Sequence, residues 1–343
     1  MVLATGSFAS RSAGRTDAYI RPAAGAAAMG FGGAYSVAPD YLISWYNPAH
    51  LASLRQTRAS LGGGFRSLGR REGAASLQFR VPPRLGAGIS VLYRGDPSIR
   101  GLYDGYYEGG TVVREEALER TAFTSITTKF AVGYNFSRAL KLGASIGVFY
   151  QSLPTTPNDD GEVLNSSVTT IGGFDFAAQY TVTEPWIIAL QLKNLGGRVK
   201  WHFEDVDWSR PPREEKIVPS FVLASHLTSE LAERVFIWNL DLVNYFPDTD
   251  GDDLISPEMV IHTGAEWQYS SNFYIRAGIG DIEINSDIYR NSSEFFRAFS
   301  PRFSAGFSWD MVNVMEGVRL NYAIATDRIW AGVDQAMDIT FIF

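Results

Sequence analysis

The chain has 343 residues, of which 45% are hydrophobic and 20% charged, a composition typical of folded rather than disordered proteins. Its net charge of −7 argues against a nucleic-acid partner, because neutralising phosphates requires a basic surface. The absence of cysteine excludes disulfides, zinc–thiolate sites and a cysteine nucleophile. No apolar run reaches the roughly 18 residues of a membrane helix, so the chain is either soluble or crosses a membrane as a β-barrel, whose strands escape hydropathy analysis.

The first residues, MVLATGSFAS, resemble the end of a secretory signal, because an apolar stretch is followed by small residues. The basic start of such a signal is missing, so a truncated signal peptide and an ordinary N-terminus are both open interpretations. The residues that follow, up to about residue 55, are mostly small or apolar and have the period of neither a helix nor a strand. Their glycines permit close backbone approach, and the Asn47-Pro48 pair indicates a turn.

From residue 57 onward, apolar and polar residues alternate with the period of two that predicts β-strands. In GVRLNYAIATD, for example, Val318, Leu320 and Tyr322 share the face opposite Arg319 and Asn321. Many of these segments suit tilted membrane strands of about 9–11 residues better than globular strands of about 5–6. The fourteen predicted strands are 57–67, 73–81, 84–95, 122–134, 139–152, 168–180, 186–198, 214–228, 233–245, 259–270, 272–284, 301–310, 317–328 and 334–343.

The predicted connections are long at one end of the strands and short at the other. The long ones are 96–121, 153–167, 199–213, 246–258 and 285–300. The short ones are 82–83, 135–138, 181–185, 229–232, 271 and 311–316. Outer-membrane barrels have long outer loops and short periplasmic turns, whereas a propeller or stacked sandwiches have no reason to alternate in this way. The sequence therefore predicts an all-β protein, a 14-stranded antiparallel transmembrane β-barrel in contact with lipid of the bacterial outer membrane.

A barrel of this size encloses a lumen, and the segment before the first strand can fill it. We predict that residues 1–55 form an N-terminal segment and luminal plug, and that residues 56–343 form the barrel. The turn of the plug would be held by Asn47, Pro48 and Ala49, and its close packing would depend on Gly30, Gly32 and Gly33.

The last strand, AMDITFIF, places Phe341 and the terminal Phe343 on one face. A terminal aromatic on an alternating strand is what the outer-membrane assembly machinery reads, so these two residues are predicted to be a barrel-assembly signal. The alternative is a strand that merely ends in phenylalanine.

The stretch GAAAMGFGGAYSVAPDYLISWYNPAHLASL resembles the N-terminal hatch signature of FadL-type transporters and of the PorV/PorQ family. That signature is Gly, small residues, Met-Gly-x-Gly-Gly-Ala, a later Asp and then Asn-Pro-Ala-x-Leu-Ala. The matching residues are Gly25, Met29, Gly30, Gly32, Gly33, Ala34, Asp40, Asn47, Pro48, Ala49, Leu51 and Ala52. The C-terminal residues VRLNYAIATDRIWAGVDQAMDITFIF are similar to the PorV/PorQ ending. The bulky Tyr41, Leu42 and Ile43 depart from the small residues usual in the family.

The resemblance implies two different functions. PorV-type members bind cargo in type IX secretion, which implies a secreted or surface-attached protein partner at the extracellular loops. FadL-type members are passive channels gated by the hatch, which implies a hydrophobic small molecule in the lumen. The C-terminal similarity favours the PorV/PorQ function, with FadL-type transport of hydrophobic compounds as the alternative. The tyrosine-rich loop 96–121 is typical either of a contact surface or of an extended hairpin.

One predicted outer loop carries an acidic pattern. Asp248, Asp250 and Asp252 stand at positions 1, 3 and 5 of an EF-hand-like loop, and Glu258 lies next to the position of the final ligand. Hard oxygen ligands at this density attract calcium, so a calcium ion in the extracellular loop is predicted. The alternative is a solvated acidic turn.

Other patterns do not indicate chemistry. GFGGAY lacks the strand and the βαβ frame of a dinucleotide site, and the four histidines have no metal-ligand spacing. Nothing sets a nucleophile beside a base, so the chain is not expected to be an enzyme, and apart from calcium no cofactor is expected.

Overall fold

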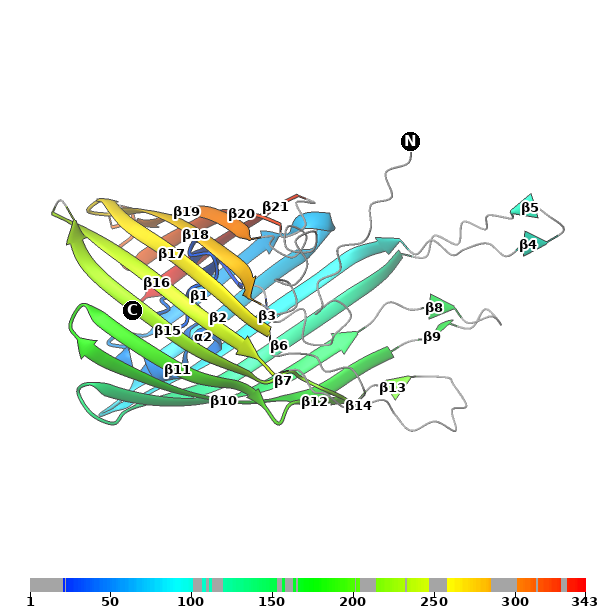
Figure 1. Ribbon diagram of the computed structural model, residues 1–343, viewed down its shortest axis with the longest axis horizontal. Helices are drawn as coiled ribbons and strands as arrows, with labels where there is room; N and C mark the ends of the chain where they lie inside the picture. The colour runs from blue at the N-terminus through cyan, green and yellow to red at the C-terminus, as the bar shows by residue number, and fades with distance from the viewer. Residues whose placement is uncertain are drawn as a thin grey trace.

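The computed structural model describes residues 21, 23–100, 107–108, 111–112, 120–152, 156–157, 163–164, 166–200, 202–203, 214–231, 233–246, 258–284, 301–312, 314–327 and 332–343. Within them, fourteen long antiparallel strands form a closed barrel (Figure 1). These are β1 (Arg58–Phe65), β2 (Arg71–Val81), β3 (Leu85–Arg100), β6 (Arg120–Asn135), β7 (Leu140–Ser152), β10 (Ser166–Thr183), β11 (Trp186–Leu195), β15 (Ser220–Leu231), β16 (Arg234–Tyr245), β17 (Glu258–Ser270), β18 (Phe273–Ile284), β19 (Arg302–Asp310), β20 (Val318–Thr326) and β21 (Val333–Ile342).

Each long strand pairs with the next along the chain, and the last pairs with the first, where Arg58 lies opposite Ile342. The remaining elements are short. They are the strands β4 (Tyr107–Glu108), β5 (Thr111–Val112), β8 (Thr156–Pro157), β9 (Val163–Leu164), β12 (Arg198–Lys200), β13 (His202–Phe203) and β14 (Glu214–Lys216), and the helices α1 (Ala26–Gly30), α2 (Ile43–Tyr46), η1 (Pro48–Ser53) and η2 (Ser67–Gly69). The predicted all-β barrel of fourteen strands is therefore confirmed.

One predicted strand, 214–228, is divided in two. Its first residues form β14, which pairs with β12, and the wall strand β15 begins only at Ser220. Pro219 stands directly before Ser220 and has no N–H to donate to a ladder of hydrogen bonds. The proline therefore accounts for the break between β14 and β15.

The two ends of the barrel differ. Short turns join β2 to β3, β6 to β7, β10 to β11, β15 to β16, β17 to β18 and β19 to β20 at one end, on the left in Figure 1. Both ends of the barrel wall lie there too, because the Phe343 N–H donates to the Thr57 carbonyl over 2.9 Å. Short turns of outer-membrane barrels face the periplasm. We therefore call this the periplasmic end, and the opposite one the outer end.

The outside of the wall is apolar. In β6, Phe130 and Val132 are exposed, whereas their neighbours Lys129 and Ala131 are buried on the inside. Phenylalanine, leucine, tryptophan and tyrosine side chains are exposed in the same alternating way on strands around the barrel. A continuous apolar exterior is stable in lipid rather than in water, which places the chain in the outer membrane. In the described part of the chain, no helix is long and apolar enough to cross a membrane.

The inside of the barrel is occupied by the residues that precede β1. Residues 23–54, which we call the inner segment, comprise α1, α2 and η1 and are almost entirely buried (Figure 1). Helix α1 contacts β18, β19, β20 and β21, whereas η1 contacts β2, β3, β6, β7 and β10. The inner segment therefore reaches from one side of the lumen to the other. The predicted N-terminal unit also includes residues 1–20, which lie outside the described residues.

Candidate functional site

The inner segment touches the wall backbone to backbone, and one of these contacts involves a glycine of the predicted motif. Gly32, with φ of +66°, lies against β18, where a Cβ on Gly278 would overlap the Gly32 amide and one on Gly280 would overlap its carbonyl oxygen. On the neighbouring strand β17, a Cβ on Gly264 would likewise overlap Phe31. This close fit requires glycine on both sides.

The other two glycines of the predicted motif behave differently. Gly33, with φ of +96°, faces His262, whose Nδ1 would lie 2.9 Å from an added Cβ. Gly30 ends α1 and lies against Arg276, with room for a tight Cβ contact of 3.3 Å. Gly33 therefore meets a side chain rather than backbone, and Gly30 is the least constrained of the three.

Two wall carboxylates bind the start of α1. Asp338 of β21 accepts the N–H groups of Ala26 and Ala27 at 2.7 and 3.1 Å, and Glu72 of β2 accepts the N–H of Gly25 at 2.9 Å. The first N–H groups of a helix have no partner within it, so these carboxylates satisfy buried donors. Glu72 is in turn paired with Arg66 and Arg94 at 2.6 and 2.8 Å.

A third carboxylate binds the middle of the inner segment. Asp241 of β16 accepts the N–H groups of Tyr35 and Ser36, each over 3.0 Å. Nearby Asp40, from the predicted motif, pairs with Arg319 at 2.8 Å and accepts from the Tyr35 hydroxyl. Burial opposes the charge of Asp40, but Arg319 and two further arginines outweigh it and hold the pKa of that carboxyl below its usual value.

The Asn-Pro-Ala turn is held from within. Asn47 is fully buried, its Oδ1 accepts the Ala49 N–H over 3.0 Å, and its Nδ2 donates to the Val37 carbonyl over 3.0 Å. This is the arrangement of an N-cap, here for η1, with Pro48 at the first helical position. On the wall, a Cβ on Gly143 would overlap Ala49, so this turn also packs directly on a strand.

His50 follows the turn and forms a 3.1 Å contact from its Nδ1 to the Gln179 side chain. Burial, together with the nearby charge of Lys141, lowers the pKa of His50 to about 3. The imidazole is therefore neutral at physiological pH.

A cavity of ≈ 100 Å³ lies between the inner segment and the wall. Aromatic and aliphatic side chains line it together with charged ones; the lining includes Trp45, Tyr46, Val222, Val243, Tyr245, Lys129, Lys193 and Asp241. The Lys129 ammonium pairs with Asp175 and lies 4.9 Å from the centre of the Trp45 ring. The cavity thus combines apolar surface with polar groups, of which Lys129 is paired and the Asp241 Oδ1 has no hydrogen-bond partner in the described structure.

The wall beside this cavity is irregular. The pairing of β10 with β7 shifts at Gly172, and its pairing with β11 shifts next to Asp175. Gly173 has φ of +105°, and a Cβ on Gly172 would overlap the Phe149 ring. This break in the ladder is called the β10 bulge below. Asp175 connects it to the cavity, because its side chain accepts from the N–H of Asn194, which lines the cavity, over 2.8 Å.

The other predicted sites are only partly described. Asp248, Asp250 and Asp252 lie outside the described residues, and Glu258, in β17, pairs with Arg21 at 3.2 Å. Within the described ranges, no group of three or more His, Cys, Asp or Glu side chains could hold a metal ion. The predicted calcium site therefore stays a prediction.

The C-terminal strand closes the barrel. Phe341 lies opposite Ala59 and Val318, and Phe343 is 71% exposed at the periplasmic end. Its role as an assembly signal stays a prediction. Most residues of the predicted outer loops, where a protein partner was expected, lie outside the described residues.

A scan against protein-family models and a search of the curated proteins gave no match. Solved structures are similar over most of the chain. The toluene transporter TodX of Pseudomonas putida is 13% identical, covers 93% of this chain and 97% of its own, and has a TM-score of 0.56. The CymD monoaromatic hydrocarbon channel is 14% identical, with the same coverage and a TM-score of 0.58. A deltaS2 mutant of TodX is 14% identical, covers 93% of this chain and 98% of its own, and has a TM-score of 0.60. At these identities the likeness concerns the fold alone, which this chain shares with these outer-membrane channels.

Proposed function

We propose that this chain is a passive channel that takes up hydrophobic small molecules across the outer membrane, without catalysis. The observation that carries the proposal is the juxtaposition of the partly apolar cavity with the β10 bulge. The fold supports the same function, because solved barrels of this architecture are described as a toluene transporter and as monoaromatic hydrocarbon channels. An aromatic hydrocarbon is the class of substrate that we infer.

The inner segment blocks a straight path along the barrel. Transfer from water into the bilayer stabilises a hydrophobic molecule by roughly 25 cal/mol per Å² of its apolar surface. The bilayer is therefore the favoured destination of a molecule that enters the barrel. The β10 bulge offers a sideways route, since Gly172 and Gly173 carry no side chains and the Phe149 ring lies against Gly172. We infer that molecules leave the cavity through this part of the wall, with Phe149 as the group that must move.

The PorV/PorQ-like function, binding of a secreted protein, has less support. The main support for this function is the similarity of the C-terminal residues to the PorV/PorQ ending. In the structure, those residues form wall strands and contact the inner segment. Asn321 links Arg276 to Asp338, and Ala323 packs in the same buried cluster as Met29. These contacts within the barrel explain the residue types of the C-terminal strands without a protein partner.

The test is uptake of a radiolabelled monoaromatic hydrocarbon by bacterial cells that express the chain in their outer membrane. Deleting Gly172 removes the extra residue of the bulge and makes the pairing of β10 with β7 continuous. We expect uptake to fall at least fivefold, towards the level of cells without the chain. The matched control deletes Tyr269, the extra residue of a bulge between β17 and β18 at the periplasmic end.

The outcomes separate the two parts of the proposal. If wild-type cells take up no more hydrocarbon than cells without the chain, the proposed function is wrong. If uptake is present but survives the loss of Gly172, transport stands and the sideways route is wrong. Heat-modifiable migration of the folded barrel on gels verifies that both deletion variants are closed.

A further inference from the structure

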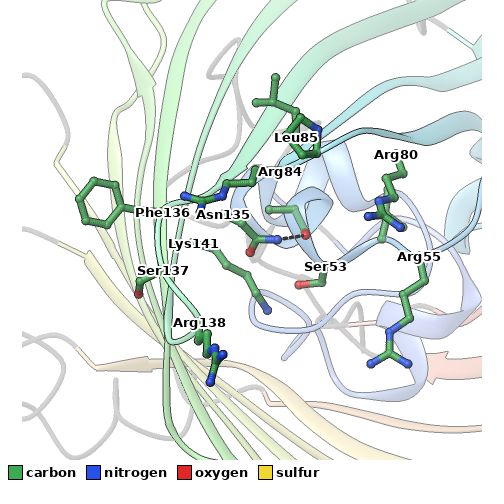
Figure 2. A pocket seen from close by; sticks show the side chains of 13 residues that line it. Ser53, Arg55, Arg80, Arg84, Leu85, Asn135, Phe136, Ser137, Arg138 and Lys141 are labelled. Atoms are coloured by element: carbon green, nitrogen blue, oxygen red, sulfur yellow. Dashed lines mark hydrogen bonds between the residues drawn. The ribbon is translucent and has the colours of Figure 1, made fainter.

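A second and larger cavity lies at the periplasmic end of the barrel. It has a volume of ≈ 750 Å³ and is formed by the end of the inner segment, the β2–β3 turn and the β6–β7 turn (Figure 2). Its lining contains five cationic side chains and no carboxylate; the cations are Arg55, Arg80, Arg84, Arg138 and Lys141. The chain as a whole carries a net charge of −7, so this concentration of positive charge does not follow from composition.

The five cations are not neutralised by their neighbours. Within the described ranges, none of them forms an ion pair, whereas the lumen cations Arg66, Arg94, Arg276 and Arg302 each face a carboxylate. Lys141 is half-buried, and its ammonium points into the cavity in Figure 2. Like charges gathered in a concave site repel one another and attract an anion.

A neutral group in the same lining also lacks a partner. The Ser53 hydroxyl is buried and makes no hydrogen bond in the described structure, although it borders the cavity. Its neighbour Asn135, by contrast, is engaged, because its Nδ2 donates to the Ala52 carbonyl over 2.8 Å (Figure 2). A buried hydroxyl without a partner costs free energy unless a ligand supplies one. Ser53 is therefore a donor available to an oxyanion.

The lipid-facing edge of the cavity is apolar. Leu85 and Phe136 line it and are 42% and 59% exposed on the lipid side of the wall, and Figure 2 shows the Phe136 ring directed away from the cations. Next to them on the outside lie Tyr134 and Leu142, which are also exposed. The positive charge thus meets the bilayer surface at the level where headgroups of the periplasmic leaflet lie.

We propose that this cavity binds the phosphate group of an anionic phospholipid from the periplasmic leaflet, with the acyl chains lying against Leu85 and Phe136. Arg84 and Arg138 stand on the two turns that flank the cavity and meet the phosphate from either side. Arginine suits this role, because its planar guanidinium donates two parallel hydrogen bonds to a phosphate. Lys141 and the Ser53 hydroxyl complete the site from the lumen.

The test uses the full-length chain in detergent, titrated with phosphatidylglycerol or phosphatidylcholine and followed by native mass spectrometry. The variant carries Arg84→Gln and Arg138→Gln, both at exposed turn positions. The matched control carries Arg71→Gln and Arg234→Gln, which remove the same charge at exposed positions outside the cavity. We expect phosphatidylglycerol to bind the wild type and the control at least tenfold more tightly than the variant, and more tightly than phosphatidylcholine.

Equal binding of phosphatidylglycerol to the wild type and the variant would overturn the site. Inorganic phosphate, titrated in parallel by calorimetry, distinguishes the source of the anion. If it binds with the same dependence on Arg84 and Arg138 while the two lipids bind alike, the oxyanion site stands and the lipid as its source is wrong. The result does not depend on hydrocarbon uptake, so its failure leaves the proposed function untouched.

Discussion

The attachment of the inner segment at Asp338 can be tested by changing this residue to alanine. The substitution leaves the N–H groups of Ala26 and Ala27 without their acceptor inside the barrel. An unsatisfied buried donor costs about 1–3 kcal/mol, so the two together destabilise the seated position of α1 by about 2–6 kcal/mol. That corresponds to a roughly 30-fold to 20,000-fold increase in the population of the displaced state.

Hydrogen exchange of the folded barrel, followed by mass spectrometry, measures this displacement directly. We expect the peptide that contains α1 to lose protection by at least 30-fold, while peptides from β6 and β7 keep theirs. Asp338→Asn retains an acceptor oxygen for these N–H groups and should therefore lose less free energy than Asp338→Ala. Glu316→Ala, at an exposed periplasmic turn, is the control. Protection of α1 within threefold of the wild type in Asp338→Ala would refute the reasoning.

Two further predictions concern the same segment. Gly280→Ala places a methyl group onto the Gly32 carbonyl oxygen, and we expect small-solute leakage through reconstituted barrels to rise several-fold as the inner segment shifts. Gly73→Ala, whose added Cβ would meet nothing closer than 3.9 Å, should change leakage little. Equal leakage through the two variants would contradict the close contact. Because burial lowers the pKa of His50 to about 3 against about 6.5 in the unfolded chain, its contribution is complete above pH 6.5 and is lost as the pH falls towards 3. The protection of η1 against hydrogen exchange, corrected for intrinsic rates, should therefore fall between pH 7 and 5 by up to about 2 kcal/mol. In His50→Gln this protection should depend less on pH. The same slope in both proteins would contradict the assignment of the pH dependence to His50.

The wall could be predicted from the sequence because each strand faces lipid on one side and a polar lumen on the other. That contrast produces a period of two in the sequence, and each of the fourteen predicted spans overlaps one wall strand. The break before β15 carried a local signal as well, since Pro219 stands inside the predicted strand. The β10 bulge likewise has the paired glycines Gly172 and Gly173, which are typical of an irregular strand.

The contacts inside the barrel had no such signal. Asp338 binds Ala26 across 312 positions of sequence, and that pairing depends on the stagger of every strand in between. Glu72 was not identified as an anchor for the same reason, and it lies one residue before the predicted span 73–81, whereas β2 begins at Arg71. The basic cavity unites Arg55, Arg84 and Arg138 from three separate connections, which only the closed barrel brings together.

The two carboxylates that hold the start of α1 belong to β2 and β21, the strands on either side of β1. The N-terminal residues of the inner segment therefore span the seam where the first and last parts of the wall meet, acting as a clasp across the joint. The β1–β21 ladder closes the wall, and the seated α1 adds hydrogen bonds to the strands on both sides of that closure, so displacement of α1 would weaken the barrel where its first and last strands meet.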